Sequence, residues 1–243
     1  MLANARLWAR RLLRRLGYDL HSLPIDSLTL RDLEFDLCYL IKISRPIVID
    51  VGANTGQTID LIRRTLNKPS IISFEPNPAL AAGLKQRYAD SIVVEAMAVG
   101  SSEGITTFNV SDNHELSSIL DVDKNDTNPF SDTPIREIIS VPITTLDSYA
   151  KNHNLPHIDL LKIDTQGFDL EVLRGAAEML RRRIVHTLLV EVNFTSYYKN
   201  QAGLGEIERF LAANGYGLLT FYETNRWNSC LRWATACFRR KIQ

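Results

Sequence analysis

The chain has 243 residues, of which 45% are hydrophobic, and its 28 basic residues (Lys and Arg) are balanced by 28 acidic residues (Asp and Glu). This apolar content can fill a complete core, which excludes a chain that is disordered throughout. The formal net charge of zero removes the overall basic field of many nucleic-acid-binding proteins, so we expect no nucleic acid partner.

The cysteines and the apolar runs indicate where the protein resides. Cys38, Cys230 and Cys237 form no CxxC pair, and no cluster of cysteine and histidine accompanies them at metal-ligand spacing. This usage favours a reducing compartment and predicts no bound metal. No run reaches the roughly 18 apolar residues of a spanning helix, and the N-terminus lacks the apolar core of a signal peptide. The sequence therefore predicts a cytoplasmic protein.

The N-terminal residues 2–16 carry five arginines and no acid. On a helix, the arginines fill one side and most apolar residues the other, although Leu7 falls among the arginines. Such a helix can contact the inner face of a membrane, but docking of its apolar stripe on its own domain is the more common arrangement. We assign residues 1–45 to an N-terminal helical appendage and residues 46–243 to one domain.

From residue 47 onward, short runs rich in β-branched residues alternate with helical stretches. The predicted strands are residues 47–51, 70–75, 91–96, 158–164 and 187–192, and the predicted helices are residues 57–67, 78–89, 168–182 and 203–214. Strands and helices in alternation imply right-handed crossovers and a parallel sheet with helices on both faces. The sequence thus predicts an α/β fold.

Two regions depart from this alternation. Residues 101–143 contain two short strand-like runs, ITTFNV and IISVPI, on either side of a polar loop. Near the C-terminus, residues 216–222 and 231–238 are separated by a turn, which predicts an antiparallel pair that closes the sheet.

The most informative motif is VIDVGANTG, in which a strand runs through Asp50 into Gly52, Asn54 and Gly56 before a helix begins near Gln57. Glycine lets the backbone come close to a ligand that a Cβ would push away. The middle glycine of the dinucleotide fingerprint GxGxxG is absent, and the acid before the first glycine would repel a pyrophosphate. The motif therefore favours S-adenosylmethionine, which carries an ammonium group, over NAD. A ligand-free packing turn is the alternative interpretation.

Glu75 strengthens the prediction of a nucleoside ligand. It ends the second predicted strand, about 20 residues past the glycines, where a carboxylate suits the hydroxyl pair of a ribose. Pro76 and Asn77 follow directly, stop the strand and give the loop a fixed shape.

Five motifs in this order are similar to the FkbM-type family of class I S-adenosylmethionine-dependent methyltransferases. They are VIDVGANTGQT, FEPNP, EAMAVGSSEGITTF, TTLDSY and LLKIDTQGFDLEVLRGA. The resemblance runs from about Ile47 to about Glu191 and implies a Rossmann-like, doubly wound seven-stranded sheet whose C-terminal strand is reversed. It also implies methyl transfer to an oxygen, commonly a hydroxyl of a sugar, polyketide or other natural product. A small molecule or glycan is then the expected acceptor.

The resemblance assigns roles to individual residues. It places Asp50, Gly52, Asn54 and Gly56 around the methionine end of the cofactor. It places Glu75 at the ribose, the residues from Ala96 to Ala98 beside the adenine, and Asp164 at the end of a strand, facing the methyl group. Ser117 and Ser118 resemble a Ser-Ser element near the pocket, but a turn hydroxyl that bonds its own backbone is an equal alternative.

The chain departs from the family pattern in three places. The family more often has an acid at the position of Gln166, a Glu at that of Asp169 and an Asp at that of Thr235. We therefore expect Gln166→Glu to be tolerated.

Asp164, His114 and Glu191 are the candidates for a catalytic base. Asp164 is the first choice, although it can equally bind the cofactor or cap the following helix. His114 lies in a polar loop that is long enough to cover a substrate, but a solvated loop histidine is the more common case.

Two other functions remain as alternatives at this stage. An NAD-dependent dehydrogenase would need the missing GxGxxG turn. A nucleoside-binding protein that sits on a membrane surface without catalysis would depend on the arginines of residues 2–16.

Overall fold

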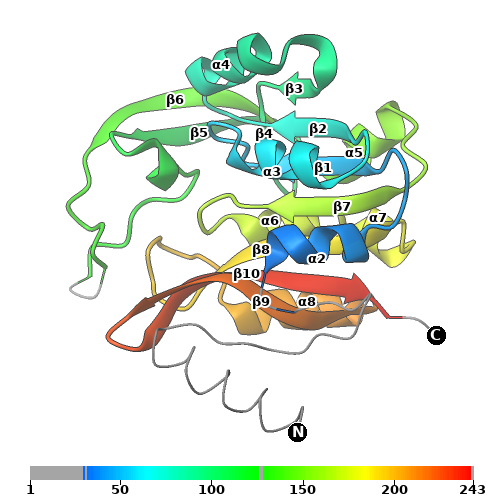
Figure 1. The fold of residues 1–243 in the computed structure, drawn as a ribbon. Helices are drawn as coiled ribbons and strands as arrows, with labels where there is room; N and C mark the ends of the chain where they lie inside the picture. The colour runs from blue at the N-terminus through cyan, green and yellow to red at the C-terminus, as the bar shows by residue number, and fades with distance from the viewer. Residues whose placement is uncertain (1–29, 31, 126–127, 242–243) are drawn as a thin grey trace, which may run out of the picture.

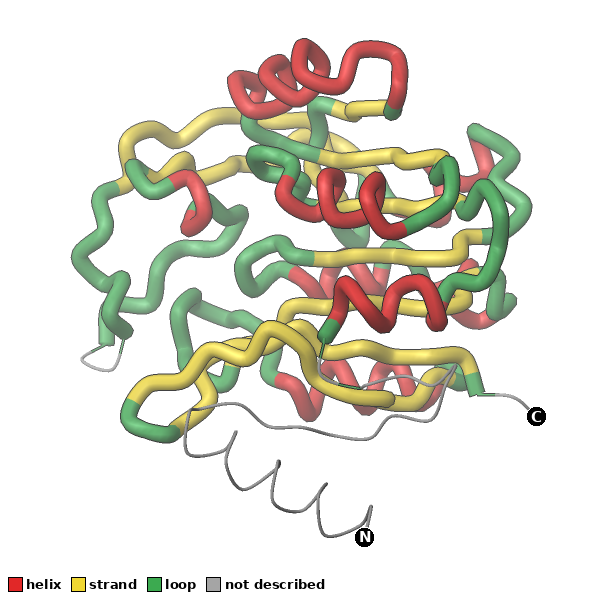
Figure 2. The backbone as a smooth tube through the Cα atoms, viewed as in Figure 1, coloured by secondary structure: helices red, strands yellow, loops and turns green. Residues whose placement is uncertain are grey.

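The computed structural model describes residue 30, residues 32–125 and residues 128–241. The predicted helix over residues 2–16 lies outside the described residues. The described part forms a seven-stranded sheet with helices on both faces (Figures 1 and 2). The sheet has the order β3-β2-β1-β7-β8-β10-β9. Its strands are β1 (Ile47–Val51), β2 (Ser70–Phe74), β3 (Val93–Glu95), β7 (Ile158–Ile163), β8 (Val185–Asn193), β9 (Tyr216–Trp227) and β10 (Cys230–Arg240).

The strand directions confirm the α/β fold with a mostly parallel sheet. β3, β2, β1, β7 and β8 pair in parallel, whereas β10 is antiparallel to both β8 and β9. β9 therefore runs in the same direction as the other parallel strands, and β10 is the reversed C-terminal strand that the sequence predicted.

Two apolar layers hold helices against the two faces of the sheet. One layer contains buried residues of α2 (Leu33–Leu40), α3 (Gln57–Thr65) and α4 (Pro78–Tyr88). The other contains buried residues of α5 (Leu146–Asn152), α6 (Asp169–Arg174), α7 (Ala177–Arg181) and α8 (Leu204–Ala213). Because neighbouring strand residues such as Val48 and Ile49 enter opposite layers, a central strand such as β1 contributes to both cores.

The single helix predicted over residues 168–182 is wrong, because α6 and α7 are separate helices. Gly175 lies between them, and a Cβ at this position would overlap the carbonyl oxygen of Gly100. The close approach of these two backbones breaks the helical run, although its apolar pattern continues.

Part of the predicted appendage packs on the domain itself. Leu37 and Leu40 of α2 lie in the same core as Val48 of β1. The buried carboxylate of Asp36 accepts a hydrogen bond of 2.9 Å from the Tyr222 hydroxyl of β9. α2 is thus tied to the sheet, and a domain boundary at residue 45 stays a prediction. Among the described residues, no helix is long and apolar enough to cross a bilayer.

The predicted strands of residues 101–143 form a sheet of their own. β4 (Ala98–Val99), β6 (Ile135–Thr144) and β5 (Gly104–Ser111) pair in the order β4-β6-β5. The short 3₁₀ helices are η1 (Ala89–Ser91) and η2 (His114–Leu116). In Figure 1, the connection between β5 and β6 lies on the side toward which the parallel strands point.

Candidate functional site

A cavity of about 520 Å³ opens at the carboxyl ends of β1, β2, β7 and β8. The chain leaves β1 toward β2 on one side and returns to β7 on the other, and such a switch point is where α/β sheets bind ligands. The predicted site residues that line this cavity are Gly52, Asn54, Glu75, Pro76, Ala98, His114, Asp164 and Glu191. Asp50, Gly56, Asn77 and Ala96 do not line it.

The two glycines of the β1–α3 turn are required by contacts within the protein. Gly52 and Gly56 have φ angles of +86° and +94°. A Cβ at Gly52 would overlap the backbone carbonyl oxygen of Asp164, and a Cβ at Gly56 would overlap the Tyr88 hydroxyl. From the sequence, these glycines had two interpretations, a backbone that comes close to a ligand and a ligand-free packing turn, and the contacts within the protein account for them as a turn. Because Gly52→Val would disturb this turn, we expect the variant to lose stability as well as ligand binding.

Glu75 joins the loops that follow β1 and β2. Its Oε2 accepts a hydrogen bond of 2.7 Å from the backbone N–H of Asn54, and its Oε1 accepts one of 2.8 Å from that of Asn77. Glu75 is only 4% exposed, and burial raises its pKa more than these two donors lower it. Pro76 lies beside it in the cavity wall. Asn77 instead caps α4, because its Oδ1 accepts a hydrogen bond from Ala79.

Two buried side chains near the turn have acceptor oxygens without a donor among the described residues. Both carboxylate oxygens of Asp50 and Oδ1 of Asn54 are buried without a hydrogen bond. Burial raises the pKa of Asp50 to about 7, although the nearby charge of Lys162 opposes the shift. Because Asn54 lines the cavity, its free acceptor fits the ammonium group of an amino-acid ligand. Asp50 lies behind the wall and adds negative charge there when it is ionised.

The predicted adenine edge is brought to the cavity only in part. Met97 and Ala98 line the cavity, whereas Ala96 is exposed to solvent outside it. The loop between β3 and β4 thus turns Ala96 away and Met97 inward.

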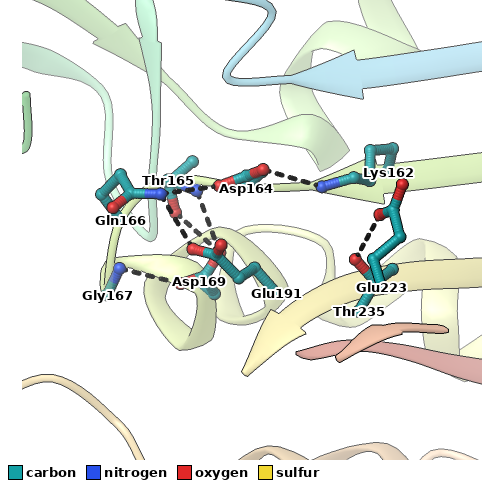
Figure 3. Close-up of polar contacts among 9 residues, drawn as sticks. All are labelled: Lys162, Asp164, Thr165, Gln166, Gly167, Asp169, Glu191, Glu223 and Thr235. Atoms are coloured by element: carbon teal, nitrogen blue, oxygen red, sulfur yellow. Dashed lines mark hydrogen bonds and ion pairs between the residues drawn. The ribbon is translucent and has the colours of Figure 1, made fainter. Parts of the chain in front are cut away.

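A polar cluster, drawn in Figure 3, lines the cavity at the end of β7. The ammonium group of Lys162 donates a hydrogen bond of 3.0 Å to Asp164 Oδ2, and Gln166 Nε2 donates one of 3.0 Å to Asp164 Oδ1. The same Nε2 donates at 2.9 Å to Glu191 Oε2. Sequence reasoning missed Lys162. Its one signal was a lysine inside the apolar strand LLKID, two residues before Asp164.

The electrostatics of this cluster separate its two carboxyl groups. Burial would raise the pKa of Asp164, but the charge and hydrogen bond of Lys162 lower it overall. Burial raises the pKa of Glu191 well above its ordinary value, and the charge of Asp164 raises it further. Asp164 therefore holds the negative charge of the pair more readily, and Glu191 holds the proton.

Asp169 organises the loop that carries Gln166. Its Oδ1 accepts a hydrogen bond of 3.0 Å from Thr165 N–H, and its Oδ2 accepts one of 3.1 Å from Gly167 N–H. Burial raises the pKa of Asp169 to about 6. Gln166 has a φ of +54°, and its Oε1 accepts a hydrogen bond of 3.0 Å from the Tyr198 hydroxyl.

The mid-chain loop forms one rim of the cavity. His114 in η2 lines the cavity and is exposed. The hydroxyl of Ser117 accepts a hydrogen bond from Ser111 N–H, and that of Ser118 donates one of 2.8 Å to the carbonyl of Gln166. Both serines thus bond to backbone, Ser117 also lines the cavity, and Ser118 fastens the loop to the distant Gln166 turn rather than to its own turn.

The far wall of the cavity was not found from the sequence. It consists of Asn193, Tyr197, Tyr198, Glu223 and Trp233. Asn193 ends β8, Tyr197 and Tyr198 follow it, and Glu223 and Trp233 belong to β9 and β10; no motif marks them. The Thr235 hydroxyl donates a hydrogen bond of 2.9 Å to Glu223 Oε2 (Figure 3), so this departure from the family pattern supports the wall.

Comparison with known proteins points to one family. The model of the FkbM methyltransferase domain matches residues 50–218. The chain is 25% identical over 177 residues to the 2-O-methyltransferase NoeI of Sinorhizobium fredii. The matched region covers 69% of this chain and 72% of that protein. The chain is also 26% identical over 183 residues to the methyltransferase sdnD of Sordaria araneosa. This match covers 63% of this chain and 71% of that protein.

The fold is also similar to a solved structure. The methyltransferase FkbM of Methylobacillus flagellatus superposes with a TM-score of 0.50 at 16% identity. The similar region covers 83% of this chain and 49% of that chain, so this chain spans about half of that protein's length.

Proposed function

The chain belongs to the FkbM family of methyltransferases, and we propose that it transfers a methyl group from S-adenosylmethionine to a hydroxyl of a sugar or another natural product. The observation that carries this proposal is the cluster at the end of β7, in which Lys162 and Gln166 hold two carboxyl groups at the cavity wall. The name of the relative NoeI, a 2-O-methyltransferase, agrees with an oxygen as acceptor.

The cofactor would occupy the part of the cavity between the ends of β1 and β2. When bound, S-adenosylmethionine supplies a methyl group that its positively charged sulfur already activates. Each oxygen of Glu75 keeps acceptor capacity beyond its one backbone donor, which suits the ribose hydroxyls. Asn54 Oδ1 would accept from the ammonium group, and Pro76 and Met97 would flank the adenine.

Glu191 supports proton removal better than Asp164, which was the first choice from the sequence. Asp164 uses its two oxygens to bind Lys162 and Gln166, and its lowered pKa makes it a weak proton acceptor. The raised pKa of Glu191 makes its ionised carboxylate the stronger base. We therefore propose that Glu191 takes the proton of the acceptor hydroxyl and that the charged Asp164 orients this hydroxyl.

Binding of the cofactor can be tested first, because this test does not require that the acceptor is known. Calorimetry should give micromolar affinity for S-adenosylhomocysteine, about 8 kcal/mol, and no heat of binding with NADH. Tight binding of NADH in place of S-adenosylhomocysteine would contradict the proposal.

Transfer to oxygen is tested next with cell extract and S-adenosylmethionine that carries a tritiated methyl group. We expect a labelled product whose mass spectrum places the methyl group on oxygen, and no label with heat-inactivated protein. A product methylated on nitrogen or carbon would contradict the proposal that the acceptor is a hydroxyl, but it would still support methyltransferase activity.

Contact with a membrane surface through the arginines of residues 2–16 is a separate proposal, since these residues lie outside the described part. Co-sedimentation with anionic liposomes should require residues 1–20 and should weaken at high salt. Equal sedimentation of the shortened chain would contradict it.

A further inference from the structure

We propose that the acceptor half of the cavity takes an uncharged hydroxylated ring, such as a neutral glycoside, and rejects acceptors that bear phosphate or carboxylate groups. This inference rests on the proposed function, because it concerns the molecule that receives the methyl group. It is carried by the charges of the cavity wall and by a buried hydroxyl that makes no hydrogen bond of normal geometry within the described part of the chain.

Acidic groups outnumber basic groups in the wall of the cavity. The lining acids are Glu75, Glu115, Asp164, Glu191 and Glu223, and the lining bases among the described residues are Lys162 and His114. Even with Glu191 protonated, the acids remain in excess. A methyl donor with one net positive charge would offset only part of this excess.

Lys162 is not available to bind an anionic acceptor. Its ammonium group donates to Asp164 Oδ2, and the side chains of Lys162 and Asp164 are 6% and 35% exposed. The charge of Arg232 opposes the rise of the Tyr197 pKa, but the guanidinium group lies over the Trp227 ring at 5.0 Å, and Arg232 does not line the cavity. An anionic group would therefore meet carboxylates without a free lysine or arginine in the wall, which is costly where water is excluded.

Neutral polar groups also line the wall. Tyr197 is 5% exposed, and its buried hydroxyl makes no hydrogen bond of normal geometry among the described residues, although Thr195 and Arg232 lie near enough to oppose the rise of its pKa. Asn193 is buried and also lines the cavity. Burial makes an unpaired hydroxyl costly, so this position fits a ligand that brings a hydrogen-bonding group of its own. A sugar hydroxyl can donate and accept at once, as such a site requires.

Aromatic rings accompany these neutral groups. The rings of Phe130 and Tyr197 are 5.4 Å apart, and both residues line the cavity together with Trp233. Apolar surface with a few placed polar groups is typical of ligand pockets. Here it suits the C–H face of a sugar ring, whose hydroxyl edge can reach Tyr197 and Asn193.

The experiment separates acceptors by charge. A small-molecule extract of cells that express the protein is divided by anion exchange into an unretained and a retained fraction. Each fraction is incubated with the full chain and tritiated S-adenosylmethionine. We expect at least about tenfold more transfer to the unretained fraction, because like charges in an interface cost several kcal/mol. Preferential or equal methylation of the retained, anionic fraction would overturn the inference while leaving the methyltransferase activity intact.

Failure of the proposed function gives a different result. If no fraction is methylated by protein that still binds S-adenosylhomocysteine, the transfer activity itself fails, and the acceptor inference fails with it.

Charge variants test the cause of the selection. Glu115 lines the rim and is exposed, so Glu115→Lys and Glu115→Gln should fold normally. Glu115→Lys should shift the ratio of transfer toward the anionic fraction several-fold, and Glu115→Gln should do so less. Glu208→Lys, on the exposed face of α8 and outside the cavity, should leave the ratio unchanged. An unchanged ratio in Glu115→Lys would show that wall charge does not select the acceptor.

Tyr197→Phe tests the neutral contact. Loss of the hydroxyl should raise KM for the acceptor about tenfold, the usual effect of leaving one hydrogen bond unmade, without weakening S-adenosylhomocysteine binding. An unaltered KM would remove Tyr197 from the acceptor site.

Discussion

The buried ammonium group of Lys162 lies 3.0 Å from Asp164 Oδ2 and thereby fixes which carboxyl group at the end of β7 carries the charge. Without this lysine, Asp164 and Glu191 would compete for one proton with only Gln166 between them. The chemistry of the site therefore depends on a lysine that the motif LLKIDTQGFDLEVLRGA contains but to which the sequence assigned no role.

Lys162→Met tests this relationship. The change leaves Asp164 beside other acids without a countercharge, so we expect a loss of about 2–4 kcal/mol in the free energy of unfolding at pH 8, somewhat less than for a fully enclosed pair. Urea unfolding measures the loss. Lys151→Met, at an exposed position of α5, should change stability by less than about 0.5 kcal/mol. Adding Asp164→Asn to Lys162→Met should recover part of the loss, and strictly additive losses would contradict the pairing.

Glu191→Gln should lower turnover by about 10²–10⁴-fold, the usual contribution of a positioned acid or base. Affinity for S-adenosylhomocysteine should change little, because Glu191 belongs to β8, whereas the proposed cofactor position lies between the ends of β1 and β2. The wild-type rate should rise with pH as Glu191, whose pKa is raised by burial, loses its proton. Label transfer from tritiated S-adenosylmethionine measures both effects, with Glu178→Gln on the exposed surface of α7 as the control. A larger loss in Asp164→Asn, with the pH dependence of Glu191→Gln intact, would return the base to Asp164.

Asp50 should make stability depend on pH. Its pKa is raised to about 7, so between about pH 4 and pH 7 the folded state retains a proton that the unfolded chain releases. The free energy of unfolding should therefore fall as the pH rises through this range. Asp50→Asn stays neutral, so it should match the wild type near pH 4 and exceed it by up to about 4 kcal/mol near pH 8 without ligand.

Urea unfolding at several pH values tests this slope. Asp112→Asn, at an exposed position, should leave it unchanged. Equal slopes for Asp50→Asn and the wild type would mean that Asp50 is ionised in the fold without cost.

Glu75→Ala should weaken binding of S-adenosylhomocysteine by about 1–3 kcal/mol, the loss expected for charge-assisted hydrogen bonds. Part of the loss will come from the loops, because the N–H groups of Asn54 and Asn77 lose their acceptor. Calorimetry measures the affinity, and Glu208→Ala is the matched control. Unchanged affinity would exclude Glu75 from the cofactor site.

Gln166→Glu should destabilise the protein by about 1–3 kcal/mol at pH 8, contrary to the expectation from the family pattern. The Nε2 of Gln166 donates to Asp164 and Glu191, and an acid there would place a third carboxyl group between these two. The loss should shrink as the pH falls and a proton is shared. Denaturant unfolding at pH 8 and pH 5 tests this, and equal stability to the wild type at both would contradict the bridging role.

The sequence alone predicted the parallel sheet, an antiparallel pair at its end and the loops at which the cavity opens. These features depend on short-range patterns, such as the β-branched runs of the strands and the turn from Asp50 to Gly56, which local conformational preferences dictate. Glu75 was found in the same way, because the end of a strand is visible in the sequence.

Only the tertiary structure decided how the site works. Gly52 is required by the carbonyl of Asp164, and Gln166 joins Asp164 to Glu191, because β1, β7 and β8 lie side by side. Which buried groups are charged depends on distances between residues that are far apart in the chain. Tyr197 likewise follows no motif, and its hydroxyl became a candidate acceptor contact only because folding buried it in the cavity wall, where it makes no hydrogen bond of normal geometry to the residues that the structure describes.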